Sequence, residues 1–208
     1  MKNSVCIIGF NYSYNVLLKS FLISRKFNII GIAGKARRKK IHNLSIKYFT
    51  SWEKMILQLK PDIVAIGVPP KEQEKILSFL FKKKINFLCE KPISKNNKFL
   101  SYLKTLDKNN KSIKLIDLNF ITIPAIQKFK KLISKKKINK YSKIEINWYF
   151  KPKSLKKNSS WKNKQNQLGD EINNFFFHLV SVIEFLFGDF KINLVHKKDK
   201  FYNFLFKN

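Results

Sequence analysis

Several residue types that mark common protein classes are scarce in this chain. Glycine and proline number six each among 208 residues, which argues against a disordered chain of low complexity. Its two cysteines, Cys6 and Cys89, both fall in apolar runs of strand length. Such cysteines are typical of a core, so we expect reduced, buried thiols.

Long hydrophobic runs are missing as well. The first ten residues, MKNSVCIIGF, lack the apolar segment and cleavage site of a signal peptide. The apolar run at 175–188 is too short to span a bilayer and contains His178 and Glu184, so it predicts a core helix. We therefore expect a cytoplasmic protein with no membrane partner.

Acidic residues are few, and the formal charge is +30 because 43 Lys and Arg face 13 Asp and Glu. Such a charge usually points to nucleic acid or an anionic surface. Here the lysines are spread along the whole chain, and no aromatic-interleaved RNA motif accompanies them. We expect a solvated basic surface, with salt-sensitive, non-specific nucleic-acid binding only.

Motifs of several enzyme classes are absent. His42 and His196 have no partner at metal-ligand spacing and the two cysteines lie far apart, so no metal site is predicted. The sequence also has no Ser/His/Asp set and no phosphate-binding P-loop.

What the chain does contain is an alternation of strands and helices in its first part. Apolar runs of strand length alternate with segments whose apolar residues recur at helical spacing, as at Val16, Leu17, Phe21 and Leu22. The expected strands are 4–9, 27–33, a weak one at 48–49, 62–67, 86–90 and 113–118. This pattern predicts βαβ units and an α/β fold, a Rossmann-type doubly wound parallel sheet over residues 1–119.

The pattern changes in residues 120–208, where we expect an α+β domain. Alternating apolar residues at 144–150 indicate an antiparallel strand with one buried face. The other expected segments are a helix around 126–133, an exposed loop at 151–167, a helix at 175–187 that ends at Gly188, and a strand at 191–196.

The turn after the first strand tests for nucleotide binding. The dinucleotide fingerprint requires glycines at positions i, i+2 and i+5, where this chain has Gly9, Asn11 and Tyr14. Asn11 tolerates a left-handed backbone, but its side chain and the Tyr14 ring take space that a pyrophosphate would need. The amino end of the following helix still offers free N–H groups to an anion.

The segment after the second strand lacks the acid that usually binds the adenosine ribose. Gly34, Lys35, Arg37 and Arg38 stand near its place. These cations either accept a 2′-phosphate, which would favour NADP over NAD, or belong to the general lysine excess. The sequence leaves both alternatives open.

The stretch NFLCEKPIS, 86–94, is the candidate for the chemistry. Its apolar strand stops at Glu90, Lys91 and Pro92, and the crevice beyond the carboxyl ends of parallel strands is where open α/β sheets bind ligands. On its own, EKP in a lysine-rich chain is more often a surface turn. Its surroundings reverse that preference.

These surroundings resemble the Gfo/Idh/MocA family, the glucose-fructose oxidoreductase and inositol dehydrogenase group of sugar-directed NAD(P) enzymes. In that family a strand ends in a (T/V)PP turn, here Val68-Pro69-Pro70, and (L/V)CEKP(L/I)(A/S) follows about twenty residues later, here 88–94. Residues 119–124 look like the entry into the family's second domain. His178, ten residues before Gly188, looks like its helix motif. Family members are usually longer, so the resemblance implies an incomplete second domain.

The resemblance implies hydride transfer between nicotinamide and a hydroxyl-bearing carbon of a sugar, sugar nucleotide or cyclitol. Lys91 would orient the hydroxyl and take part in proton transfer, with Glu90 as its orienter and a contact to substrate. Pro92 would fix the backbone, for which a cis bond is one route. The implied cofactor-binding residues are Gly9, Asn11, Lys35, Arg37, Val68, Pro69, Pro70, Glu90 and Lys91.

The second domain would supply His178 as a further acid/base, although a histidine in an aromatic helix is as often a core residue. Asn174 stands where many members carry an aspartate; it can hydrogen-bond a sugar hydroxyl but cannot take its proton. Gln73 replaces the family's histidine after PP, and Phe176 replaces a small residue.

Two further alternatives stay open. Asn11, Tyr14 and Asn174 fit a degenerate, non-catalytic relative with weak or no cofactor binding and a partner or structural role. Members of the family commonly pair through the open sheet of the second domain, so a homo-oligomer is the other alternative.

Overall fold

A computed structural model of the protein describes residues 2–34, 45–94, 96–135, 146–147, 171–198 and 201–207. For 171–175, 192–198 and 201–207 the description covers the backbone alone. The chain divides into two compact units, Met1–Asp117 and Leu118–Asn208, and each is described by itself.

The first unit is built on a six-stranded parallel sheet with the order β3-β2-β1-β4-β5-β6. Its strands are β1 (Asn3–Ile8), β2 (Phe27–Ala33), β3 (Lys47–Phe49), β4 (Ile63–Ile66), β5 (Asn86–Glu90) and β6 (Lys114–Asp117). This order reverses direction between β1 and β4, which is the switch point where such sheets bind dinucleotides. The predicted α/β, Rossmann-type parallel sheet is confirmed.

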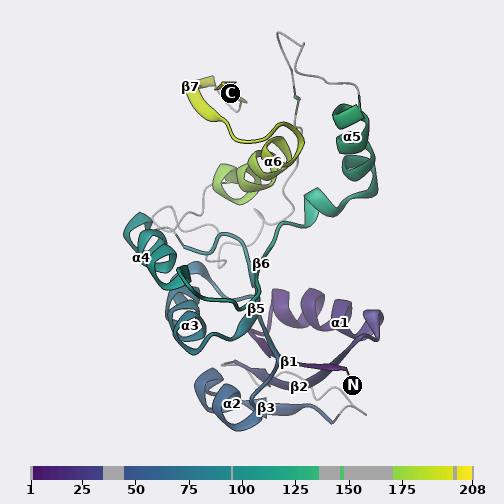
Figure 1. Ribbon diagram of the computed structural model, residues 1–208, viewed down its shortest axis with the longest axis vertical. Coiled ribbons are helices and arrows are strands. Elements are labelled where there is room, and N and C mark those ends of the chain that lie inside the picture. The colour runs from purple at the N-terminus through teal and green to yellow at the C-terminus, as the bar shows by residue number, and fades with distance from the viewer. Residues whose placement is uncertain are drawn as a thin grey trace. The chain divides into compact units, whose positions relative to one another are not determined.

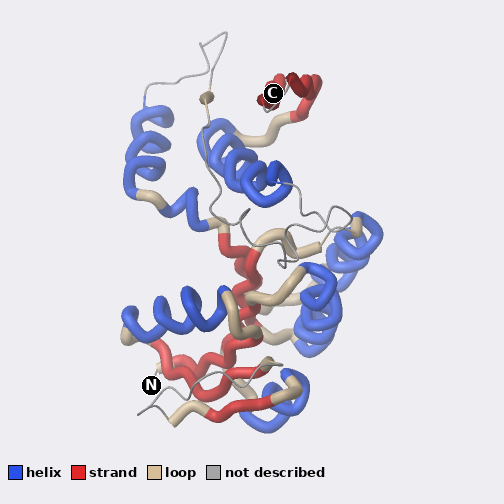
Figure 2. The backbone as a smooth tube through the Cα atoms, turned by 180° about the vertical axis from the view of Figure 1, so that it is seen from behind, coloured by secondary structure: helices blue, strands red, loops and turns tan. Residues whose placement is uncertain are grey.

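Helices cover both faces of this sheet, as Figure 1 and Figure 2 show. They are η1 (Ser13–Leu17), α1 (Leu18–Ser24), α2 (Trp52–Leu59), α3 (Pro70–Lys83) and α4 (Asn97–Asp107). Along β1, Val5 and Ile7 pack in the cluster with η1 and α1, whereas Cys6 and Ile8 pack in the cluster with α2, α3 and α4. Successive strand residues point to opposite faces, so a strand buried on both sides reads as one apolar run.

Local signals set several helix ends. The Ser51 side chain accepts a hydrogen bond from the Lys54 N–H at 3.2 Å and caps α2, with Glu53 in the first turn. That helix ends at Lys60, whose φ is 45°, directly before Pro61. The next helix, α3, begins at Pro70, a favoured first position because its missing N–H would have no helical partner.

The helix after β1 differs from the expected regular spacing. It begins as a five-residue π-helix, η1, before continuing as α1. Val16 and Leu22 are 40% and 39% exposed, while Leu18 is 2% exposed. The wider π turn rotates the following residues relative to a 3.6-residue period, so the buried face is Leu17, Leu18 and Phe21.

The second unit contains η2 (Asn119–Thr122), α5 (Pro124–Lys135), α6 (Glu171–Phe187), β7 (Lys191–Lys198) and β8 (Phe201–Lys207). Ile133 on α5 packs with Val182 and Leu186 on α6. Gly188 follows α6 with φ 87°, and its N–H donates to the Glu184 carbonyl at 2.8 Å. The strands β7 and β8 pair antiparallel, and sequence reasoning identified only the first of them.

Two expectations fall outside this description. The predicted loop at 151–167 lies in residues that the structure does not describe, as does the strand tract 144–150 apart from residues 146–147, which have no regular structure. Among the described residues, no helix combines the length and apolar character needed to cross a membrane.

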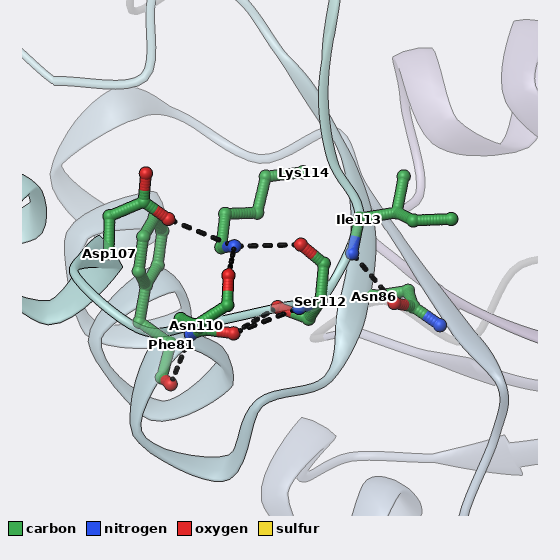
Figure 3. Close-up of polar contacts among 7 residues, drawn as sticks. All are labelled: Phe81, Asn86, Asp107, Asn110, Ser112, Ile113 and Lys114. Atoms are coloured by element: carbon green, nitrogen blue, oxygen red, sulfur yellow. Dashed lines mark hydrogen bonds and ion pairs between the residues drawn. The ribbon is translucent and has the colours of Figure 1, made fainter.

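The connection from α4 to β6 is held by the Lys114 ammonium (Figure 3). Its Nζ lies 2.9 Å from Oδ1 of Asp107 and donates to the carbonyls of Asn110 at 2.9 Å and Ser112 at 2.7 Å. The same Nζ lies 5.7 Å from the ring centroid of Phe81. One cation at the start of β6 thus satisfies two loop carbonyls and one carboxylate.

Two asparagines fasten the same connection to its neighbours (Figure 3). Asn110 Nδ2 donates to the Phe81 carbonyl at 3.0 Å, near the end of α3. Asn86, the first residue of β5, accepts the Ile113 N–H at 2.8 Å and donates to the Asp62 carbonyl at 3.0 Å. These bonds fix the amino edge of the sheet at β4, β5 and β6.

Replacing Lys114 tests this arrangement. Lys114→Met keeps an apolar stem but leaves two carbonyls without their cationic donor, and the side chain is only 16% exposed. We expect the free energy of unfolding, measured by urea denaturation, to fall by about 1–3 kcal/mol. The same change at the exposed Lys108 is the control, and equal stability of the two variants would contradict the assignment.

Candidate functional site

The turn after β1 packs directly against the residue that follows β4. Gly9 has φ 113°, and a Cβ there would lie 2.6 Å from the Gly67 carbonyl oxygen and 2.7 Å from Ser13 Oγ. A Cβ at Gly67 would in turn overlap Ser13 Oγ. Position 9 therefore requires glycine, and position 67 requires it as long as Ser13 keeps its hydroxyl.

Ser13 ties this contact to the sheet. It is fully buried, and its Oγ donates to the Ile8 carbonyl at 2.8 Å, which also accepts the Gly67 N–H at 3.0 Å. The third fingerprint glycine normally permits close packing of helix on strand. Here Ser13 and Gly67 permit it, a small residue on each side, and sequence reasoning named neither as a site residue.

The two other fingerprint positions, Asn11 and Tyr14, differ in how far they are exposed. Asn11 is exposed, and its carbonyl accepts the Asn15 N–H at 3.0 Å. Tyr14 is half-buried and packs against the cluster on the α1 face. The tight turn at Gly9 and the exposed side chain of Asn11 are compatible with a dinucleotide at this end of the sheet.

The predicted adenosine end is described only in part. Phe10 lies so close to Gly34, at the end of β2, that a Cβ on Gly34 would overlap the Phe10 ring. Lys35, Arg37 and Arg38 lie outside the described residues, and a preference for NADP stays a prediction.

The EKP stretch follows β5 at the same edge of the sheet. Glu90 ends the strand, Lys91 is half-buried and the Lys91–Pro92 peptide bond is cis. One carboxylate oxygen of Glu90, Oε2, is buried. The backbone therefore leaves the strand at Lys91, as the sequence predicts, with Glu90 directly before it.

The VPP turn and the EKP stretch are held together by Gln73. Its Nε2 donates to the Val68 carbonyl at 2.8 Å and to the Glu90 carbonyl at 3.1 Å. Val68 and Pro69 are half-buried, while Pro70 is buried as the first residue of α3. The two predicted stretches thus meet at the carboxyl ends of the neighbouring strands β4 and β5.

Cys89 completes the contacts of Gln73. Its Sγ donates to Gln73 Oε1 at 3.1 Å. Burial raises the pKa of this thiol, and the negative charges of Glu90 and Asp117 raise it further. The thiol is therefore protonated at neutral pH and acts as a donor, and its predicted place in the core is confirmed.

A second side chain reaches across this edge. The Tyr12 hydroxyl, in the turn after β1, donates to Asp117 Oδ2 at 2.9 Å, at the end of β6. Asp117 is the register partner of Glu90, and β4 and β5 lie between β1 and β6. Tyr12 also packs against the cluster on the η1 and α1 face, so its side chain crosses β4 and β5 near their carboxyl ends on that face of the sheet. No motif marks either residue in the sequence.

His178 and Asn174 belong to the second unit, on α6. The His178 side chain is 7% exposed, with its Nδ1 buried and its ring centroid 4.3 Å from that of Phe120. Asn174 lies one turn earlier, and its side chain is outside the description. Lys91 belongs to the first unit, and its pairing with His178 stays a prediction.

Metal ligands do not cluster in the part of the chain that the structure describes. There, no three His, Cys, Asp or Glu side chains gather in a way that would hold an ion. The groups described at the carboxyl edge of the sheet are the Lys91 amine, the Glu90 and Asp117 carboxylates, the Tyr12 phenol and backbone groups.

Comparison with known proteins matches the first part of the chain to a family. The model of a family described as "Oxidoreductase family, NAD-binding Rossmann fold", Gfo/Idh/MocA, matches residues 3–118. No curated protein matches the chain.

Similar solved structures include the WlbA (WbpB) dehydrogenase from Thermus thermophilus, in complex with NAD and UDP-GlcNAcA, with 17% identity and a TM-score of 0.73. An oxidoreductase from Thermotoga maritima is 18% identical with a TM-score of 0.74. The match covers 95% of this chain and 67% of the first, and 96% of this chain and 65% of the second.

A myo-inositol 2-dehydrogenase from Lactobacillus plantarum is 14% identical, with a TM-score of 0.60 and coverage of 66% of this chain and 42% of that one. The chain thus spans between 42% and 67% of the length of these three proteins. At such identities the likeness concerns the fold.

The contact of Ser13 with Gly67 can be tested by a double-mutant cycle. Gly67→Ala adds a methyl group against Ser13 Oγ and should cost about 1–3 kcal/mol of unfolding free energy. Ser13→Ala removes that oxygen, so the double variant should be less destabilised than the sum of the single changes. Urea denaturation of the four proteins measures this, and strictly additive costs would refute the contact.

Proposed function

The chain belongs to the Gfo/Idh/MocA oxidoreductase family, and on that premise we propose that it is an NAD-dependent oxidoreductase acting on a sugar, sugar nucleotide or cyclitol. The reaction is hydride transfer between C4 of the nicotinamide and a hydroxyl-bearing carbon. The observation that carries the proposal is the joining of the VPP turn to the EKP stretch through Gln73, next to the switch point of the sheet.

Each residue has a role in this proposal. The turn at Gly9 and Asn11 receives the pyrophosphate, and the segment Val68-Pro69-Pro70 lines the cofactor site together with Glu90 and Lys91. When bound, the cofactor supplies the hydride acceptor or donor. Lys35 and Arg37 contact the adenosine end, and NADP in place of NAD is the alternative that they favour.

The proton chemistry belongs to Lys91. Its amine orients the substrate hydroxyl and takes or returns the hydroxyl proton as the carbon is oxidised or reduced. Glu90, directly before it, orients the amine and contacts the substrate. His178 is the second acid/base candidate, and Asn174 donates a hydrogen bond to a hydroxyl without exchanging a proton.

The substrate class is a polyol with neighbouring hydroxyl groups. The similar structures include a dehydrogenase crystallised with UDP-GlcNAcA, a myo-inositol 2-dehydrogenase and a D-galactose-1-dehydrogenase. UDP-GlcNAcA, myo-inositol and D-galactose differ in charge and size but share secondary hydroxyls. They form a rational first panel for this chain.

The Lys91→Ala variant tests the proposal. With NAD and the panel UDP-GlcNAcA, myo-inositol and D-galactose, the rise in nicotinamide absorbance should be at least about 100-fold slower than for the wild type. NADH affinity, followed by nicotinamide fluorescence, should change only a few-fold. Lys83→Ala, at the exposed far end of α3, is the control. A Lys91→Ala protein as fast as the wild type would overturn the role.

A second candidate function is a degenerate relative that keeps the fold without turnover. The hydrogen bond from Tyr12 to Asp117 favours it, because this side chain passes the strand ends where a nicotinamide would approach Lys91. In this alternative the edge is closed to the nicotinamide, and the protein serves as a partner or structural subunit.

The Tyr12→Phe variant separates the two functions. It keeps the ring and removes the bond to the carboxylate. If the bond closes the edge, NADH affinity should rise about tenfold, while the affinity for ADP-ribose, which lacks the nicotinamide, stays unchanged. Calorimetric titration with both ligands measures this. Unchanged or weaker NADH binding would rule out closure by Tyr12.

A further inference from the structure

We propose that Gln73 is a positioning residue for Lys91, which fixes the backbone from which the amine projects and couples it to the VPP turn. The role of Lys91 itself rests on the function proposed above. The position of its backbone does not, so the two can be tested separately.

The first argument is the complete use of one side-chain amide. An amide has two N–H donors and one acceptor oxygen. Nε2 donates to the Val68 carbonyl at 2.8 Å and the Glu90 carbonyl at 3.1 Å, and Oε1 accepts from Cys89 Sγ at 3.1 Å. Cys89 Sγ also lies 3.4 Å from the Glu90 carbonyl, so the thiol has a second acceptor within reach. The two carbonyls can only accept, so Nε2 and not Oε1 has to face them, and this determines the orientation of the amide.

The second argument is burial. Gln73 is 1% exposed, although it lies in the first turns of a surface helix whose neighbours Lys71 and Glu72 are exposed. A buried amide is costly unless its polar atoms are bonded. The hydrogen bonds of Gln73 to the ends of β4 and β5 therefore explain why a polar side chain is buried at this position.

The third argument is geometric. The Glu90 carbonyl belongs to the same planar peptide group as the Lys91 nitrogen, so holding that oxygen fixes the plane from which the Lys91 side chain starts. The same Nε2 holds Val68, so the two segments cannot shift independently. The carboxyl ends of β4 and β5 are thus set by one group.

The next residue of α3 fastens the other end of the loop. Ser94 Oγ donates to Glu74 Oε1 at 2.5 Å and accepts the Asn96 N–H at 2.8 Å. Asn96 caps α4 through its Oδ1, which accepts the Lys98 N–H at 3.0 Å. Consecutive side chains of α3 therefore hold the loop at Glu90 and at Ser94, on both sides of Lys91.

Gln73→Glu is the sharpest test. The replacement has nearly the same shape, but a carboxylate cannot donate and would face two carbonyl oxygens. Gln73→His keeps a single ring N–H donor in its neutral form and serves as a partial rescue. Gln58→Glu, on the exposed side of α2, is the matched control with the same change of charge.

Two ligands distinguish positioning from general stability. In the proposed function NADH would be held by the turn after β1 and by Lys91, whereas ADP-ribose lacks the nicotinamide. We expect Gln73→Glu to weaken NADH about tenfold and ADP-ribose less than about twofold in calorimetric titrations, with Gln73→His between it and the wild type. Gln58→Glu should bind both ligands as the wild type does.

Amide hydrogen exchange provides a readout that needs no ligand. In Gln73→Glu, exchange should be about tenfold faster at Lys91, Ile93 and Ser94, and unchanged in β1 and β2. Equal exchange in this loop would overturn the proposal. So would an equal loss of both ligands together with faster exchange in β1, which would make Gln73 a stability residue only.

The outcomes also separate this proposal from the function. If wild-type protein binds neither NADH nor ADP-ribose, the proposed function fails. Hydrogen exchange then decides on Gln73 alone: local acceleration at 91–94 supports the positioning role, and its absence refutes it.

Discussion

The carboxyl edge of the sheet depends on a problem of hydrogen bonding at strand ends. Val68 lies two residues beyond the end of β4, and Glu90 is the last residue of β5. A carbonyl that is removed from water at such a strand end needs a donor from outside the sheet ladder. Gln73 supplies both donors from one nitrogen. The start of α3, the exit of β5 and the loop that carries Lys91 all take their positions from this contact.

Two bonds of different kinds therefore cross the same edge. The buried Gln73 side chain joins the ends of the neighbouring strands β4 and β5, whereas the Tyr12 hydroxyl joins the turn after the central strand β1 to the edge strand β6. Rigid placement of Lys91 by Gln73 would serve catalysis. The bond from Tyr12 to Asp117 would instead keep a nicotinamide away from Lys91. Which of these dominates decides between the two functions that the fold admits.

The sequence predicts what local chemistry determines. The apolar runs become strands buried on two faces, because successive side chains of a strand alternate between its faces and both faces are covered here. The parallel sheet follows from the same periodicity, whereas the family resemblance rests on the VPP and CEKP motifs. The site was predicted as two stretches, VPP and EKP, and the structure brings these stretches together.

What the sequence did not reveal depends on contacts between distant residues or on irregular turns. Gln73 bonds partners 5, 16 and 17 residues away, and Tyr12 bonds one 105 residues away, so no short motif contains either contact. The π turn in η1 changes which residues are buried, and a 3.6-residue period cannot express that. The second strand of the antiparallel pair, β8, was missed although its residues are as apolar as those of β7.

The packing of Gly9, Ser13 and Gly67 has a consequence for how such a turn changes over evolution. Gly9 is fixed by its own backbone, because its φ is 113° and a Cβ there would meet the Gly67 carbonyl, but a larger residue at Gly67 demands a smaller one at Ser13. Substitutions there should be accepted as a set rather than singly. Covariation between positions 13 and 67, with position 9 kept as glycine, would then trace descent of this turn better than the glycine count of the fingerprint.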